Sequence, residues 1–201
     1  MATKRVIHSS KLRGLFPEFS KLKVLKKGST SVIAEDPIYD NRVIVYTTDY
    51  AKVLWFKKIS NKVNFSFIEE KEEGFVQDEI KNKIYVFKIN RMETLDQKRK
   101  DYVYEHILSL YQKNETKEIR KYLDNPEILK NRKIISKFEQ NMKFHKMARI
   151  SKDKRVKYMM SCLESFIENN SVAVDLKIDS FMKLPNGDIV CTDPVYSTKL
   201  V

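Results

Sequence analysis

Cysteine, histidine and glycine are all scarce in this chain, whose 201 residues include two, three and four of them. Cys162 and Cys191 form no Cys-x-x-Cys motif, which argues against a disulfide framework or a structural zinc site and favours a reducing cytosol. His8, His106 and His145 are scattered, which favours surface or helical roles over catalysis. No run of about 18 apolar residues occurs, so we expect no membrane-spanning helix. The polar first residues do not resemble a signal peptide.

Positive charge is abundant. The formal net charge is +12, and hydrophobic residues at 42%, with aromatics at 11%, are enough to build a core. The length fits one domain, or one domain of two lobes. The charge surplus favours an anionic partner, which is nucleic acid, an acidic protein surface or a phosphorylated ligand. A purely solubilising role for the charge is the alternative.

The chain changes character near residue 96. Before it, short apolar runs and turn residues predict a β-rich region with a helix over 50–59, capped by Thr48 or Asp49. The predicted strands cover 19–25, 31–34, 42–46, 64–68 and 83–89, with the acidic segment 69–73 joining the last two. After it, helical periodicity predicts helices over 96–113, from Pro126 and from Ser151. Asn186-Gly187 then predicts a hairpin between strands 181–184 and 189–192.

Two aspartates frame this hairpin. Asp175 precedes it in a predicted loop, and Asp193 ends its returning strand. Such an arrangement can bring two carboxylates to one end of a hairpin, where a divalent ion and a phosphate can be held. Taken singly, each aspartate is better explained as an ordinary loop or turn residue; their joint spacing with the Asn186-Gly187 hairpin favours the site for the fold, though not for activity.

This stretch resembles the catalytic loop and metal-binding segment of protein kinases, H-R-D-L-x-x-x-N followed by a hairpin and D-F-G. The resemblance places Asp175 at the catalytic base and Lys177 at the phosphate-contacting lysine. It places Asp193 and Ser180 at the two metal ligands. The ending Thr192-Asp193-Pro194-Val195 is similar to the host-shutoff protein kinases of small lytic podophages.

The first half agrees with the kinase order. The segments that correspond to the phosphate-covering loop, the lysine strand, the glutamate helix and the strand into the hinge are 28–31, 41–45, 50–59 and 85–92. Gly28 and Ser29 are then expected to contact a nucleotide. The resemblance implies an α+β, two-lobed minimal kinase-like fold, with a β-rich N-lobe over 1–91 and a truncated helical C-lobe over 92–201.

The departures from the kinase pattern predict a degenerate kinase. Val45 lies where the ATP-orienting lysine is expected, the following helix has no glutamate, and Ser180 replaces the metal-binding asparagine. Ala173 and Val174 replace the usual His and Arg. Only eight residues follow Asp193, so we expect no activation segment and no peptide-substrate platform. We therefore expect no cofactor, or ATP and Mg²⁺ if the protein is active, with Lys52, Lys26 or Lys27 substituting for the missing lysine.

Residues 113–158 carry 15 Lys/Arg and six Asp/Glu, a local net charge of +9. Phosphate backbones and acidic protein surfaces both attract such a segment, although a solvated helical face is the simpler explanation. No base-reading motif is present. The basic side chains recur at helical spacing at Lys130, Arg132, Lys133, Lys137, Lys143, Lys146, Arg149, Lys152, Lys154, Arg155 and Lys157.

Two functions from different classes follow. The first is a non-catalytic kinase-like accessory protein of a phage or mobile element, which binds and modulates a host macromolecule in the cytoplasm through its basic surface. The second is a divergent minimal Ser/Thr kinase with Asp175 as base and Asp193 as metal ligand. Nucleic-acid binding by the basic helices is compatible with either.

Overall fold

The computed structural model describes residues 7–73, 82–105, 161–163, 165, 166, 170, 172–174 and 178–197. The chain divides into two compact units. One comprises Met1–Glu93 with Leu184–Gly187 and Lys199–Val201, and the other comprises Thr94–Lys183 with Asp188–Thr198. Each unit is described by itself below.

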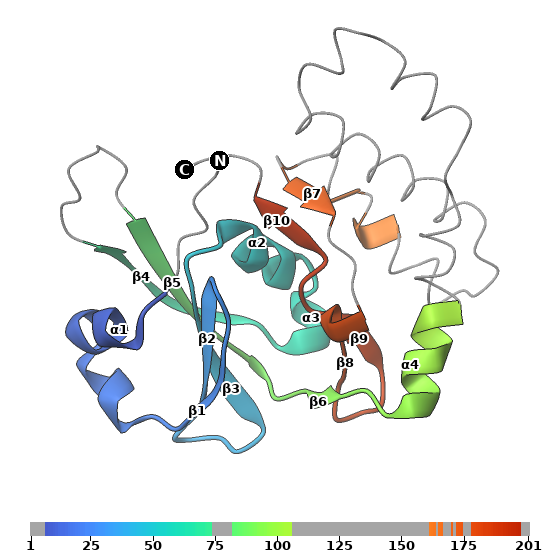
Figure 1. The fold of residues 1–201 in the computed structure, drawn as a ribbon, viewed down its shortest axis with the longest axis horizontal. Helices are drawn as coiled ribbons and strands as arrows, with labels where there is room; N and C mark the ends of the chain where they lie inside the picture. Colours follow the sequence, from blue (N-terminus) through green and yellow to red (C-terminus); the bar gives the residue numbers. More distant parts are fainter. Residues whose placement is uncertain are drawn as a thin grey trace, which may run out of the picture. The chain divides into compact units, whose positions relative to one another are not determined.

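The first unit is a five-stranded sheet with short helices (Figure 1). Its elements are α1 (Ser9–Leu15), the 3₁₀ helix η1 (Pro17–Lys21), β1 (Val24–Lys27), β2 (Ser31–Glu35), β3 (Arg42–Thr47), α2 (Tyr50–Lys58), α3 (Ser60–Val63), β4 (Ser66–Glu73) and β5 (Asn82–Asn90). The strand order is β1-β2-β3-β5-β4, and every neighbouring pair is antiparallel. The register pairs Val45 of β3 with Ile33 of β2 and Phe87 of β5, so these three side chains share one face.

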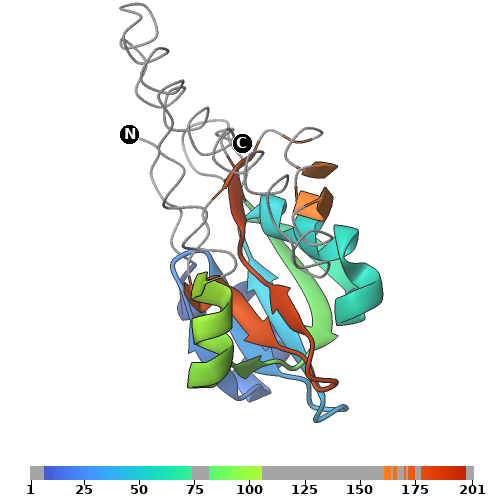
Figure 2. The same cartoon turned by 90° about the vertical axis from the view of Figure 1, so that its right-hand side faces the viewer.

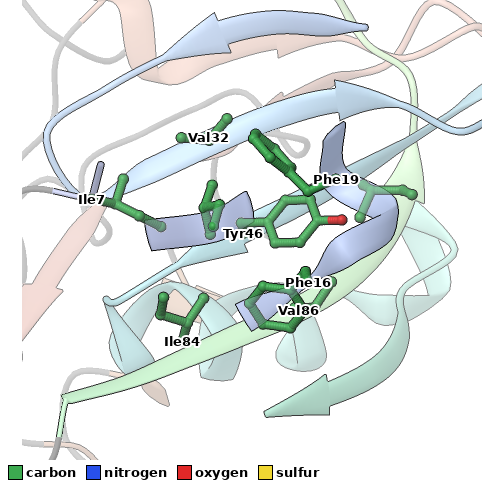
Figure 3. Close-up of a cluster of buried hydrophobic side chains, with 9 residues drawn as sticks. Ile7, Phe16, Phe19, Val32, Tyr46, Ile84 and Val86 are labelled. Carbon is green, nitrogen blue, oxygen red and sulfur yellow. The ribbon is translucent and has the colours of Figure 1, made fainter. Parts of the chain in front are cut away.

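The opposite face is covered by the N-terminal helices. Phe16 and Phe19 pack edge-on against Tyr46 of β3, with ring centroids 5.3 and 5.1 Å apart (Figure 3). Ile84 and Val86 of β5 complete this buried cluster. Burial of each large side chain contributes roughly 1.5–3 kcal/mol, so this small cluster accounts for a large part of the unit's hydrophobic stabilisation.

A lysine on the edge strand fastens the N-terminal helices to the sheet. Lys71 of β4 donates a hydrogen bond from Nζ to the Leu15 carbonyl at 2.9 Å. The same ammonium lies 4.5 Å from the centroid of the Phe16 ring, a cation–π distance. Lys71 therefore fixes the C-terminal end of α1, where a positive charge also complements the helix dipole.

Helices α2 and α3 cover the other face of the sheet, so the sheet lies between two helical layers (Figure 2). Asp49 caps α2 by accepting a 2.9 Å hydrogen bond from the Ala51 N–H. Buried Phe56 packs on Phe87, with ring centroids 5.4 Å apart. Asn64 ends α3 in the left-handed conformation, with φ 53°, as short polar residues do at helix C-termini.

One buried ion pair ties β2 to β5. The Asp36 carboxylate, whose side chain is fully buried, lies 2.9 Å from Lys88 Nζ. Burial opposes ionisation, but Lys88 and the Ile38 N–H outweigh it and hold the pKa of Asp36 below its usual value near 3.8. Asp36 Oδ1 also accepts from the Ile38 N–H at 3.0 Å, within the turn between β2 and β3.

The later elements are short. They are β6 (Glu93–Thr94), α4 (Gln97–Val103), β7 (Val172–Val174), the 3₁₀ helix η3 (Ile178–Ser180), β8 (Phe181–Lys183), β9 (Ile189–Cys191) and β10 (Val195–Ser197). Strands β6, β8 and β9 form a three-stranded sheet in that order, and β7 pairs with β10. Asp96 caps α4 through the Arg99 N–H and pairs with the Arg99 guanidinium, and these contacts lower the pKa of Asp96.

The predicted mixed α+β class is confirmed in its coarse form: a mostly antiparallel β-structure with few helices in the described residues. Two element predictions are wrong. Phe19 lies in η1 rather than in a strand, because Pro17 starts a helical turn. The acidic segment 69–73 belongs to edge strand β4, where alternate glutamates project to solvent instead of forming a loop. No helix among the described residues is long and apolar enough to span a membrane.

Candidate functional site

The loop between β1 and β2 is a tight turn of three residues, Gly28-Ser29-Thr30. The Gly28 N–H donates to the Ser31 carbonyl at 2.8 Å, and the Ile7 N–H donates to the Ser29 carbonyl at 2.9 Å. The predicted shortened loop is therefore present, and the N-terminal segment is hydrogen-bonded to it. Gly28 has ordinary space for a Cβ atom, whose nearest contact would be the Ser31 carbonyl at 3.6 Å. The loop does not require glycine there.

A chain of hydroxyl groups joins this loop to strand β3. Thr47, fully buried, donates from Oγ1 to the Thr30 carbonyl at 3.0 Å and accepts from the Asp49 N–H at 3.1 Å. Ser31 Oγ lies 2.9 Å from Thr47 Oγ1. Because the only hydroxyl proton of Thr47 is used on Thr30, Ser31 must donate to Thr47.

Lys52 completes the chain. Its Nζ atom, on α2, donates to Ser31 Oγ at 3.2 Å. The direction of donation then runs from Lys52 to Ser31, to Thr47 and to the Thr30 carbonyl. The half-buried ammonium is thus held against the strand that follows the loop. Of the predicted nucleotide-binding residues, the structure brings Lys52 to the strand adjoining Gly28 and Ser29.

Val45, unlike Lys52, lies in an apolar environment. It is 2% exposed in the middle of β3, between Ile33 and Phe87 on the face that α2 covers. A side chain here contacts apolar neighbours and not solvent. In the sheet, the position expected to carry an ATP-orienting lysine is therefore a core position.

The predicted hairpin is confirmed. Strands β8 and β9 pair in register from Phe181 with Cys191 to Lys183 with Ile189. Gly187 has φ +88°, a conformation that side-chain-bearing residues rarely adopt, and its N–H donates to the Leu184 carbonyl at 2.8 Å.

The residues after the hairpin are held by Ser180. The Ser180 carbonyl accepts from the Thr192 N–H at 2.6 Å and from Thr192 Oγ1 at 3.1 Å, which ties η3 to the segment leading to Asp193. Asp193 is exposed, whereas Ser180 is only 6% exposed. A buried serine is a poor metal ligand, so of these two residues Asp193 is better placed to meet a cation.

The Cys191 thiol contacts the backbone of Asp193. Burial raises the pKa of the Cys191 thiol, and the Asp193 N–H that donates to it only partly offsets this effect. The thiol therefore stays protonated and unreactive, and serves as an acceptor that orients the backbone of Asp193.

Asp175 and Lys177, the predicted base and phosphate-contacting lysine, lie outside the described residues. So does the basic segment, with its predicted partner-binding residues. Within the described ranges, no group of three or more His, Cys, Asp or Glu side chains is arranged to hold a metal ion. The partner-binding residues concerned are Lys130, Arg132, Lys133, Lys137, Lys152 and Arg155.

Sequence reasoning placed Ser31 in the segment that corresponds to the phosphate-covering loop, but it missed Thr47 and the hydrogen bond between these two residues. The signal that could have found them is a register effect: Ser31 and Thr47 are opposite residues on adjacent strands, in positions where apolar residues otherwise face α2. No family model matches the chain, and comparisons with curated proteins and with solved structures give no significant match.

Proposed function

We propose that this chain is a kinase-like module that does not transfer phosphate and instead binds an anionic host macromolecule and changes its activity. The observation that carries the first part is the burial of Val45, 2% exposed between apolar strands. Valine supplies no cation, and α2 and α3 contain no glutamate. Phosphoryl transfer depends on that lysine–glutamate pair together with the metal ligands.

The kinase-like part of the proposal rests on the order of elements. A hairpin with a short polar loop, a third strand, a helical segment and two more strands follow one another, as the resemblance implies. A second hairpin later in the chain ends at Asp193. This order is consistent with the proposal, and the exposure of Asp193 marks the one metal-ligand position that keeps a suitable side chain.

The binding part rests on charge. Residues 113–158 supply +9 of the total +12, so the attraction to an anionic surface is concentrated in one stretch of sequence. Clustered charge steers association and screens steeply with salt, because the Debye length is about 8 Å at physiological ionic strength.

The experiment is charge reversal in that stretch. Lys133, Lys137, Lys152 and Arg155 are changed together to glutamate, a change of eight charge units. We expect capture of a partner from the natural host's lysate, with and without nuclease, to fall at least tenfold, and wild-type capture to weaken steeply with salt.

A matched control places the same charge change elsewhere. Its four lysines are exposed residues of the first unit, Lys21, Lys27, Lys57 and Lys58. We expect this variant to keep its partner. Equal loss in both variants, or unchanged binding by the folded segment variant, would contradict the assignment of the basic segment as the binding surface.

Lys52 favours a second candidate function, the minimal kinase. Its ammonium lies 3.2 Å from Ser31 Oγ beside the predicted phosphate-covering loop, where a substitute for the missing lysine would be needed. Phosphate transfer from ATP that is lost in Asp175→Asn and in Asp193→Ala would establish this alternative over the first.

A further inference from the structure

We infer that the two edges of the five-stranded sheet bind each other between copies of this chain, with the acidic strand β4 of one copy lying beside the basic strand β1 of the next. The occupant of each edge is thus a second copy of this chain. The inference goes beyond the proposed function and does not depend on it, because it uses neither the kinase resemblance nor the basic segment 113–158.

Strands β1 and β4 are the edge strands of the sheet. In the described residues each pairs on one side only, β1 with β2 and β4 with β5. The backbone N–H and C=O groups on the outer side of an edge strand can pair with a strand of another molecule. All four neighbouring pairs in the order β1-β2-β3-β5-β4 are antiparallel, so β4 runs in the same direction as β1. A second copy in the same orientation therefore continues the sheet with its β1 parallel to β4.

The first part of each edge strand exposes apolar side chains. Leu25 of β1 is 38% exposed, and Phe67 and Ile68 of β4 are 47% and 43% exposed. Leu25 and Ile68 also lie where the register of each strand shifts, as at a β-bulge. A bulge bends an edge strand and discourages pairing with a straight one. Two edges that bend at corresponding positions fit each other better than an unrelated strand, which favours a second copy as the occupant.

The charges that follow these apolar residues are opposite on the two edges. Lys26 and Lys27 are exposed on β1, while Glu70 is exposed and Glu69 partly exposed on β4. By the register with the inner strands, Lys26 and Glu70 lie on the face that α2 covers. Lys27 and Glu69 lie on the face that the N-terminal helices cover. In the parallel arrangement, each face thus brings one lysine near one glutamate.

The glutamates of β4 keep their present partners in this arrangement. Glu69 lies 3.4 Å from Lys71, and Glu70 lies 2.8 Å from Lys83. A carboxylate has about four acceptor positions, so each glutamate can also accept from a lysine of the next copy. Pairing β1 with β1, or β4 with β4, would instead set like charges side by side, which is unfavourable. The charges therefore select the mixed pairing of β1 with β4.

The contact is heterologous, because it joins two different edges and leaves one edge of each kind open at the ends of the assembly. The four residues of β1 bury little area, so we expect association to be weak and dependent on concentration. The net charge of +12 on each copy opposes association. At physiological ionic strength this repulsion is screened beyond about 8 Å, whereas the charges of the two edges meet at contact distance.

The test measures the mass of the full chain by sedimentation equilibrium at an ionic strength of about 0.15 M. We expect the average mass of the wild type to rise with concentration without levelling off at a dimer. K26E/K27E has two acidic edges and E69K/E70K has two basic ones, so the association constant of each variant alone should fall at least tenfold. An equimolar mixture of the two variants, and a chain with all four changes, should associate as the wild type does.

A matched control makes the charge change of K26E/K27E elsewhere in the same unit. K57E/K58E alters two exposed lysines of α2 and should associate as the wild type does. If E69K/E70K does not fold, E69Q/E70Q replaces it and should weaken association severalfold, and the comparison of K26E/K27E with K57E/K58E then decides.

Several outcomes would overturn the pairing of β1 with β4. They are a wild type that stays monomeric up to millimolar concentration, a mass that levels off at a dimer, equal loss in K57E/K58E, and a mixture that associates no better than its components. Loss of association in the four-residue reversal of the basic segment, with K26E/K27E unaffected, would assign the acidic edge to that segment and also overturn it. None of these results changes the expected capture of a host partner, so this inference and the proposed function fail separately.

Discussion

Replacing Val45 by lysine tests whether the kinase-type lysine position has become core. Val45 is 2% exposed, so a lysine there must bury its ammonium or lose its proton. Full burial lowers a lysine pKa by three units or more, and three units correspond to about 4 kcal/mol. Typical domains have only about 5–15 kcal/mol of unfolding free energy, so V45K should lose a large share of it.

The assay is urea unfolding at pH 7. With a slope of about 2 kcal/mol per molar, V45K should lower the midpoint by about 2 M. V45A measures the packing part alone and should cost about 2 kcal/mol. Ile33, opposite Val45 on β2 and partly exposed, gives the matched control, and I33K should cost less because its ammonium can reach water. If V45K were no less stable than I33K and gained ATP binding, Val45 would border an open nucleotide site and the reasoning would fail.

The remaining predictions concern a metal-ligand position and an ion pair. We expect no Asp193-dependent thermal shift with millimolar ATP–Mg²⁺. The control variant changes the exposed Asp179 to alanine. A strong shift that is lost in Asp193→Ala and kept in Asp179→Ala would support the kinase function instead. Asp36→Asn should lower the free energy of unfolding by about 2–3 kcal/mol. This is below the usual range for a broken buried pair, because the Lys88 side chain keeps 20% exposure. Adding Lys88→Met should restore part of the lost stability. Because the folded-state pKa of Asp36 is lowered, the pair stabilises the fold above pH 4, and this contribution disappears as the pH falls through the lowered value. Between about pH 7 and pH 2.5, the free energy of unfolding should therefore fall less steeply for Asp36→Asn than for the wild type. Parallel pH profiles of the two proteins would contradict the ion-pair assignment.

The sequence predicted the elements whose signals are local. A cap of α2 at Thr48 or Asp49 and a hairpin turn at Asn186-Gly187 follow from side-chain chemistry within a few residues. The structure has both, with Asp49 as the cap. The helix α1 was not predicted, because seven residues with a glycine near the end carry a weak periodic signal. Its stability comes from packing against strands far along the chain.

The candidate site also has features with a local sequence signal and features that depend on packing. The short loop at Gly28 agrees with the sequence interpretation, whereas the role of Asp193 as a metal ligand stays a prediction. The meeting of Lys52 with Ser31 depends on how β2, β3 and α2 pack, which no spacing rule expresses. The burial of Val45 likewise depends on its cross-strand neighbours.

The N-terminal helices have a consequence for the order in which the protein folds. Phe16 and Phe19 are synthesised early, but their partner Val86 on β5 follows Phe16 by 70 residues. At ribosomal speeds of about 5–20 residues per second, the first helices wait roughly 4 to 14 s for the strand that completes their cluster. Strands β1 to β3, with Tyr46, are synthesised within this interval, but the part of the cluster that β5 supplies is still missing. The nascent chain therefore passes through a stage at which it is prone to aggregation, and slower decoding before β5 would lengthen that stage.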